Sequence, residues 1–356
     1  MRSFFLIALT CVLLGADEFD MFDIVDEEQS SFEDENSFID VEFKLNYQYN
    51  ETLKSNKVAF VNLKKDTKEF MVDIRLVADV DEQHILLKEL YYKGNFTQEQ
   101  YYKLGRMNIK EGYAKGFNPT DYFKNNLSLT LSNDPKEQKD NRLGSLALSY
   151  SLFLDEFVFR TLYSPKIESE KNTFLSDKSY YGLYLDKTNA ENRASVYVDY
   201  SGVKNLSSSF LLHYNDEKLN IGLNLSYIYS DFIFYFESSL KNTEELINQT
   251  TFGFTHTSEY NLVSSIEYIY NEEKESKSSV FLTTRASDAL VNLDINYIMW
   301  LNPQDGSSMA QLGFEYGLSD SFQTNIATSV YIGEDSSEYG KMPNDYEVLL
   351  ELKYFF

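Results

Sequence analysis

The feature of this chain that most limits its fold is a repeated alternation of apolar and polar residues. In VEFKLNYQY, residues 41–49, the apolar letters V, F, L, Y and Y alternate with E, K, N and Q. The same pattern returns in LNIGLNLSYIY, residues 219–229, and in ALVNLDINYIMWL, residues 289–301, and turn-like stretches such as NDEK and NPQDGSS separate the segments. A period of two predicts β-strands that have one apolar and one polar face.

Many consecutive strands of this kind are typical of a barrel that crosses a membrane, because only one face of each strand meets lipid. Tyrosines and phenylalanines are abundant, 28 and 27 respectively, and they crowd the ends of the apolar faces, where lipid head groups would lie. The alternative is a soluble β-sandwich or β-solenoid. We expect an all-β chain that forms a single transmembrane antiparallel β-barrel.

The last ten residues, EVLLELKYFF, also alternate and end on a bare aromatic residue. An edge strand this apolar would promote aggregation unless lipid or another sheet covered it. We therefore expect the strand 347–356 to pair with a strand near 38–49 and to close the barrel. About 316 residues remain after the N-terminal part, and roughly 18 to 20 residues per strand and turn predict 16 to 18 strands, an even number.

This ending resembles that of bacterial outer-membrane proteins generally, whose last strand alternates and finishes in Phe. The resemblance implies that Tyr354 and Phe356 form an assembly signal read by the barrel-assembly machinery. It also implies a location in the bacterial outer membrane, in contact with lipid and lipopolysaccharide. An even number of strands would put both ends of the chain in the periplasm.

The N-terminal part divides into two segments. Residues 1–16, MRSFFLIALTCVLLGA, combine Arg2 with an apolar run and predict a signal peptide cut after Ala16; acylation at Cys11 is the alternative. Residues 17–37 form an acidic periplasmic tail, and the stretch from 17 to 40 holds eleven acids and no base. Such a block is typical of a solvated tail, but a segment that contacts a partner or folds into the barrel is equally open. The barrel then covers 38–356.

One stretch breaks the alternation: YYKLGRMNIKEGYAKGFNPTDYFKNN, residues 101–126. Proline cannot donate to a sheet ladder and glycine permits positive φ, so this stretch predicts a departure from the wall. It resembles the stretch found in porin-like barrels of the alginate-export kind, with a Gly-Arg strand, a glycine pair and an Asn-Pro-x-Asp turn. The matching residues are Gly105, Arg106, Gly112, Gly116, Asn118, Pro119 and Asp121.

The resemblance implies a porin-like channel, and Glu111 stands where that family often has tryptophan. We expect Arg106, Glu111, Asn118 and Asp121 to belong to an inward loop. An arginine facing lipid costs about 2 to 4 kcal/mol at the bilayer midplane, so Arg106 should lie in the lumen or at its rim. Its predicted role is an ion pair with Asp121 or Glu111 that pins the loop; a contact with substrate is the alternative.

Alternation also assigns charged residues to the inner face of the barrel. Six such positions are Glu42, Lys44, Asp73, Arg75, Asp199 and Asp294. Further inward positions are Glu237, Glu267, Glu351, Arg193 and Lys353. Acids exceed bases in this group, so we expect a channel for passive diffusion of small polar solutes with a mild preference for cations.

Other functions have weaker support in the sequence. His84, His213 and His256 are too scattered for a metal site, and we find no motif for a cofactor, a nucleotide or a nucleic acid. His256 and Ser258 share a strand face, as in outer-membrane phospholipase A, but Glu259 follows where that enzyme has Asn. A non-enzymatic protein is therefore expected. A barrel that anchors a surface or structural interaction protein is the main alternative, and an oligomer is possible.

Overall fold

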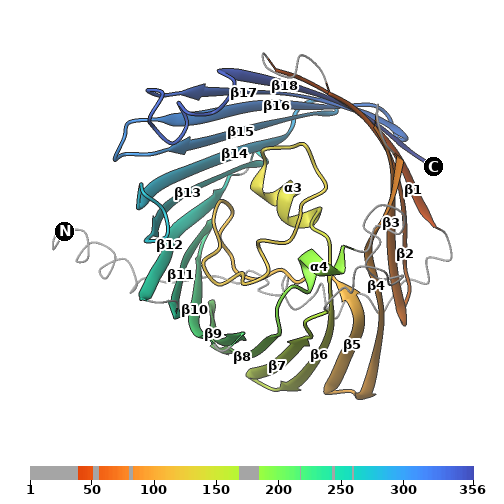
Figure 1. The fold of residues 1–356 in the computed structure, drawn as a ribbon, viewed down its shortest axis with the longest axis vertical. Coiled ribbons are helices and arrows are strands. Elements are labelled where there is room, and N and C mark those ends of the chain that lie inside the picture. The colour runs from red at the N-terminus through yellow and green to blue at the C-terminus, as the bar shows by residue number, and fades with distance from the viewer. Residues whose placement is uncertain are drawn as a thin grey trace.

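The structure is a computed structural model that describes residues 39–50, 56–79, 83–167, 184–216, 218–242, 245–258 and 260–356. It is a closed barrel of 18 antiparallel strands in which each strand pairs with its neighbours in the sequence (Figure 1). This confirms the all-β barrel and the even strand number. The expected signal peptide and acidic tail lie outside the described residues.

The strand bounds follow the alternating segments. They are β1 (Asp40–Asn50), β2 (Asn56–Asp66), β3 (Phe70–Asp79), β4 (Gln83–Thr97), β5 (Gln100–Met107), β6 (Ser145–Leu154), β7 (Phe157–Ser164), β8 (Arg193–Val203), β9 (Leu206–Asn215), β10 (Lys218–Tyr229), β11 (Phe232–Asn242), β12 (Leu246–Thr257), β13 (Leu262–Asn271), β14 (Ser278–Leu290), β15 (Leu293–Leu301), β16 (Ser308–Ser319), β17 (Phe322–Ile332) and β18 (Tyr346–Phe355). Two short helices, α3 (Pro135–Asp140) and α4 (Leu185–Thr188), lie in the connections after β5 and β7.

The barrel closes between the first and last strands. β1 and β18 run antiparallel, with Glu42 opposite Phe355 at one end and Asn50 opposite Glu347 at the other. β1 also pairs with β2, and β18 with β17, so neither terminal strand has an open edge. The predicted pairing of the chain ends is confirmed.

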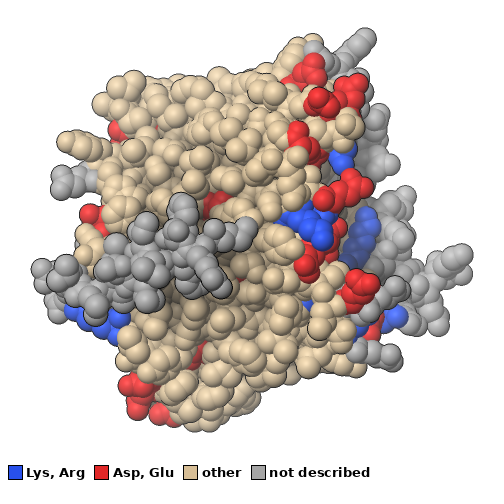
Figure 2. Space-filling view, turned by 90° about the vertical axis from the view of Figure 1, so that its left-hand side faces the viewer, with Lys and Arg blue, Asp and Glu red and all other residues tan. Residues whose placement is uncertain are grey.

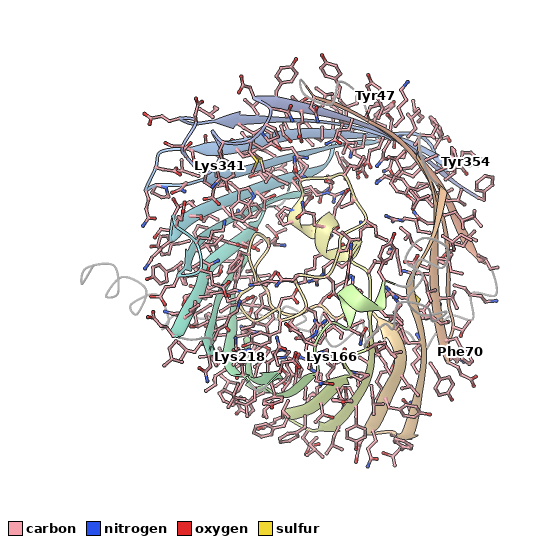
Figure 3. The ribbon with its side chains drawn as sticks, in the orientation of Figure 1. Tyr47, Phe70, Lys166, Lys218, Lys341 and Tyr354 are labelled. Atoms are coloured by element: carbon pink, nitrogen blue, oxygen red, sulfur yellow. The ribbon has the colours of Figure 1, made fainter. Side chains whose placement is uncertain are left out.

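The two faces of the wall have opposite character. Along β10, Leu219, Ile221 and Leu223 are exposed on the outside, whereas Asn220 and Asn224 are buried inside the barrel. Tyr47, Phe70 and Tyr354 project outward from the wall (Figure 3). Seen from the side, Asp, Glu, Lys and Arg gather toward the edges of the surface and leave a broad band nearly free of charge (Figure 2). An apolar outside and a polar inside are the reverse of a soluble protein.

The two ends of the barrel differ in the length of their connections. At the end that holds Asp40 and Phe356, the strands are joined by turns of two to four residues, such as 204–205 and 291–292. Asn205 and Asn292 have φ of 64° and 60°, which tight hairpin turns require and asparagine tolerates. The other end carries the longer connections, among them 108–144, 165–192 and 333–345.

One expected strand was wrong. The segment ALVNLDINYIMWL reads as a single run of alternating residues, but the chain turns at Val291 and Asn292 and divides it between β14 and β15. Only Ala289 and Leu290 of this segment belong to β14, so nearly all of its alternation is that of β15 and hydropathy alone does not reveal the turn. Among the residues that the structure describes, no helix combines the length and apolar character needed to cross a bilayer.

Candidate functional site

The candidate site is the connection between β5 and β6, residues 108–144, which we call the inward loop. It leaves the wall after Met107, runs inside the barrel and carries α3 (Figure 1). Gly112 has φ of 82°, where only glycine is unstrained. The side chain of Asp134 caps α3 by accepting from the N–H of Lys136, and Pro135 occupies the first helical turn.

Two glutamates of the barrel wall hold the first part of the inward loop. Glu237 on β11 accepts hydrogen bonds from the backbone N–H groups of Tyr113 and Ala114, the latter at 2.7 Å. Glu267 on β13 accepts from the N–H groups of Lys115 and Gly116 at 2.5 and 3.0 Å. Both glutamate side chains are fully buried. Sequence analysis placed them on the inner face but gave no sign of these contacts.

The Asn-Pro-Thr-Asp turn is also fixed to the wall. The Nδ2 group of Asn118 donates to the carbonyl of Ala114 at 2.7 Å, which tightens the turn from within. Thr120 donates to the side-chain oxygen of Asn224 on β10 at 2.8 Å. The carbonyl of Phe117 accepts from Thr251 on β12 at 2.9 Å. Glu237 on β11 lies 3.4 Å from the hydroxyl of Thr120, so three neighbouring strands contact this part of the loop.

The ion pairs of the inward loop differ from the expected ones. Asp121 pairs with Arg142 at 2.9 Å, and both side chains are almost completely buried. Glu111 accepts two hydrogen bonds from Arg160 on β7, at 3.1 and 3.2 Å. The cations that hold these acids are thus Arg142 and Arg160 in place of the expected Arg106. Both lie far from the acids in the sequence, so spacing could not identify them.

Arg106 is buried, with only 3% of its surface exposed, so its guanidinium does not lie on the bare outer face of the barrel. Gly105 just before it has φ of 138°, and a Cβ there would lie 2.3 Å from the carbonyl oxygen of Leu90.

Burial raises the pKa of Glu111, and the Arg160 guanidinium opposes that shift.

A small apolar core forms where the inward loop meets the wall. The ring of Tyr122 stacks on His213 at 4.3 Å between centroids and 7° between planes, and its hydroxyl lies 3.0 Å from the Oγ of Ser239. Burial raises the pKa of Tyr122 to about 12. The buried cluster joins loop and wall residues: Met107, Ile109, Phe123, Ala147, Leu162, Tyr197 and Leu211.

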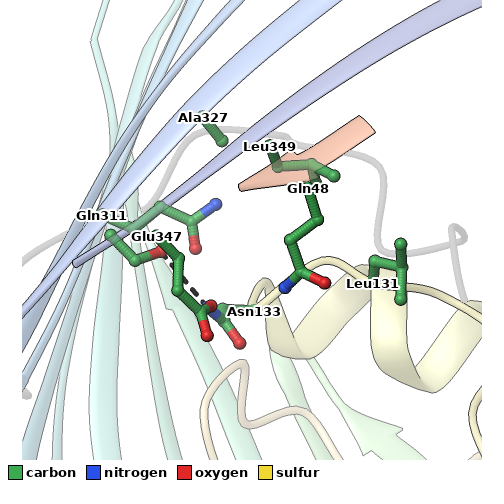
Figure 4. A pocket seen from close by; sticks show the side chains of 8 residues that line it. Gln48, Leu131, Asn133, Gln311, Ala327, Glu347 and Leu349 are labelled. Carbon is green, nitrogen blue, oxygen red and sulfur yellow. Dashed lines mark hydrogen bonds between the residues drawn. The ribbon is translucent and has the colours of Figure 1, made fainter. Parts of the chain in front are cut away.

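The second part of the inward loop crosses the lumen to other strands. Arg75 on β3 donates to the carbonyl of Leu129 at 2.6 Å and to the side chain of Asn141 at 2.7 Å. Asn133 donates to Tyr331 on β17 at 3.0 Å. It also donates to Glu347 on β18 at 3.4 Å, and both of these side chains are drawn in Figure 4. The inward loop therefore contacts walls on several sides of the barrel.

The predicted lumen charges all form contacts in the structure. Lys44 pairs with Glu351, Asp73 with Lys88 at 2.8 Å, Asp199 with Arg160 at 2.9 Å, and Asp294 with Arg285 at 2.8 Å. Glu42 accepts from Asn62 at 2.5 Å, and Arg75 binds the inward loop as described above. Four of these six charges are therefore in ion pairs, and the other two are hydrogen-bonded to neutral groups.

Two lysine side chains of the inward loop are exposed. They are Lys115 and Lys136. The backbone N–H of Lys115 is bonded to Glu267, but its side chain is exposed.

Across the part of the chain that the structure describes, no group of three or more His, Cys, Asp or Glu side chains is arranged to hold a metal ion. His256 lies beside the ring of Phe232 at 4.5 Å, and the Oγ of Ser258 accepts from the N–H of Tyr260 at 3.3 Å.

Comparison with known proteins identifies the fold. No protein-family model matches the sequence, and no curated protein matches it either. Among solved structures, OccK11 (OpdR) of Pseudomonas aeruginosa is similar, with 9% identity, a TM-score of 0.59, and coverage of 89% of this chain and 95% of that one. A mutant porin from Rh. blastica is similar with 9% identity, a TM-score of 0.51, and coverage of 90% and 99%. The chain therefore has the barrel fold of bacterial porins.

Proposed function

We propose that this protein is a porin-like channel of a bacterial outer membrane through which small polar solutes diffuse passively. The observation that carries the proposal is the presence of exposed charged side chains, Lys115 and Lys136, inside a closed barrel of 18 strands. Barrels of about 16 to 18 strands leave an aqueous path. The inward loop occupies part of this path and would limit the size of the solute.

The outer surface supports a location in a bilayer. Tyrosines lie at the two ends of the apolar faces: Tyr47 and Tyr49 near the long connections, and Tyr227 and Tyr229 near the short turns. Aromatic residues at both interfaces and an apolar band between them are typical of outer-membrane barrels. On this basis the long connections would face the cell exterior and the short turns the periplasm. Lipid and lipopolysaccharide would be the surrounding partners.

We further propose a mild preference for cations, which the mouth with the short turns supports. The described turns at this end carry more acids than bases: Glu69, Glu99, Asp155, Glu156, Asp231 and Asp320 against Lys68 and Lys204. A recess of about 250 Å³ at the same end is lined by Asp288, Asp294, Glu315 and Asp320. Negative charge at a confined entrance concentrates cations, and salt weakens the effect over about 8 Å at physiological strength.

Conductance in a planar bilayer tests the proposal. Purified, refolded protein should give discrete steps, and a KCl gradient should give a small cation-selective reversal potential that shrinks as salt rises. Absence of steps from protein that is shown to be folded would reject the channel. The barrel would then serve as an anchor for a surface or structural interaction protein. An anion-selective reversal potential would reject the proposed preference for cations and leave the channel proposal standing.

A further inference from the structure

We propose that Glu237 and Glu267 form a carboxylate latch that fixes residues 112–117 of the inward loop and thereby sets the width of the passage. This inference rests on the proposed channel function. The latch is defined by these two side chains, which project inward from β11 and β13. β12 lies between them and adds the contact of Thr251 with the carbonyl of Phe117.

The two carboxylates receive four successive backbone N–H groups, from Tyr113 to Gly116. Convergent N–H groups of this kind form a concave site that favours an anion. Charge-assisted hydrogen bonds are about twice as strong as neutral ones. Neither latch carboxylate forms an ion pair with a lysine or arginine in the described part of the chain. A buried charge without hydrogen-bond partners is costly. The N–H groups of the docked loop supply these partners, so loop and wall stabilise each other.

The loop sequence fits the latch closely. A Cβ at Gly112 would lie 2.6 Å from the Oε2 atom of Glu237, and a Cβ at Gly116 would lie 2.5 Å from the ring of Phe281. Real Cβ atoms do not approach other atoms so closely, and Gly112 also has positive φ. Both glycines of the GYAKG segment are therefore needed for the loop to reach the carboxylates.

The two glutamates use their oxygens differently. Glu267 accepts with both: Oε1 takes the N–H of Lys115 and the hydroxyl of Tyr235 at 2.7 Å, and Oε2 takes the N–H of Gly116. Glu237 takes both of its N–H groups on Oε1, and its Oε2 lies 3.4 Å from the hydroxyl of Thr120. A hydroxyl can also accept a hydrogen bond, whereas a backbone N–H cannot.

This asymmetry predicts unequal effects of the same substitution. In Glu237→Gln, the amide oxygen keeps the two N–H groups and the amide nitrogen donates to Thr120. In Glu267→Gln, the amide nitrogen must face a backbone N–H in either orientation, that of Lys115 or that of Gly116, so two donors meet. Glu267→Gln should therefore release the loop, and Glu237→Gln should release it much less.

Trypsin cleavage after Lys115 measures release of the loop without reference to conduction. Folded barrels in detergent should be cut at Lys115 about ten-fold faster or more in Glu267→Gln than in the unmodified protein, because cleavage follows the population of the released loop. Mass spectrometry assigns the cut, and heat-dependent mobility on a gel shows that the barrel is folded. Glu275→Gln is the matched control, since Glu275 is an exposed glutamate in the connection between β13 and β14.

Single-channel recording measures the consequence for the passage. Glu267→Gln should give larger and noisier steps than the unmodified channel, with Glu237→Gln between the two and Glu275→Gln unchanged in step size. Equal cleavage rates in folded Glu267→Gln and unmodified protein would overturn the latch. Faster cleavage with unchanged conductance steps would overturn the proposal that the latch sets the width of the passage. If the unmodified protein does not conduct, the channel proposal fails, and the cleavage rates alone decide whether the latch holds the loop.

Discussion

The backbone N–H of Phe356 donates to the carbonyl of Val41 at 3.0 Å, so the last residue of the chain is bonded to the strand that begins the barrel. Its ring meets that of Tyr354 edge to face at 4.6 Å. The side chain of Phe356 is otherwise 77% exposed. A residue with so few contacts contributes little to the stability of the finished barrel, although its position is well suited to recognition by another protein.

Deletion of Phe356 should therefore reduce assembly and leave transport unchanged. The amount of folded protein in the outer membrane should fall several-fold, while the conductance of each folded molecule stays the same. Phe356→Trp keeps a terminal aromatic residue and is the control. Heat-dependent gel mobility of membrane fractions measures the folded amount, and a normal yield after deletion would contradict the assembly role of Tyr354 and Phe356.

Arg142→Met should loosen the inward loop by leaving Asp121 buried without its cation. Breaking a buried ion pair from one side costs about 3 to 5 kcal/mol. Hydrogen exchange of residues 118–126 should rise strongly, while the strands keep their protection. The double variant Asp121→Asn with Arg142→Met removes both charges and should recover most of the protection. No difference between single and double variants would show that the pair does not hold the loop.

The docking of the inward loop should depend on pH through Lys124. Its Nζ lies 3.3 Å from the carbonyl of Asn118, 3.3 Å from Oε1 of Gln249 and 3.9 Å from the ring centre of Phe117. Burial, reinforced by Lys241 on β11, lowers the pKa of Lys124 to about 7, and the charges of Asp121, Glu237 and Glu273 oppose this.

A released Lys124 has a pKa of about 10.4. Between that value and about 7, the released loop binds one more proton than the docked loop, so docking strengthens as pH rises through this window and weakens as it falls. The released population should change by up to about ten-fold per pH unit. Hydrogen exchange of residues 112–126, corrected for the intrinsic effect of pH, measures it. Lys124→Met should flatten the dependence, and an unchanged slope in that variant would exclude Lys124 as its source.

Asp288→Asn together with Asp320→Asn should reduce the cation preference. Both acids line the recess at the short-turn mouth, and Asn tolerates the positive φ of 51° that Asp288 adopts. The reversal potential in a KCl gradient should move toward zero, with the difference between variant and unmodified protein vanishing at high salt. A potential unaffected at low salt would place the source of selectivity elsewhere.

Alternation was sufficient to predict the barrel because lipid and water impose opposite requirements on successive residues of every strand. The same pattern predicted that the strand ending at Phe356 would meet the strand at Val41, since a closed wall leaves no other partner for two terminal strands. Glycine and proline in residues 101–126 also predicted where the chain would leave the wall.

Partners within the lumen could not be predicted in the same way. Asp121 meets Arg142, and Glu111 meets Arg160, because of how the inward loop turns in three dimensions. Hydropathy carries no information about that path. Leu162 and Leu211 face inward where alternation favours polar residues, since the loop covers them and replaces water as their neighbour.

The crossing of the lumen by the inward loop has a mechanical consequence for the seam between β1 and β18. Leu129 and Asn141 are bound to Arg75 on β3, on one side of the seam, and Asn133 is bound to Glu347 on β18, on the other. The inward loop thus connects the two sides of the β1–β18 seam through the inside of the barrel. Strain that opens the ladder between β1 and β18 is resisted from inside the barrel, by the contacts of the inward loop with β3 and β18.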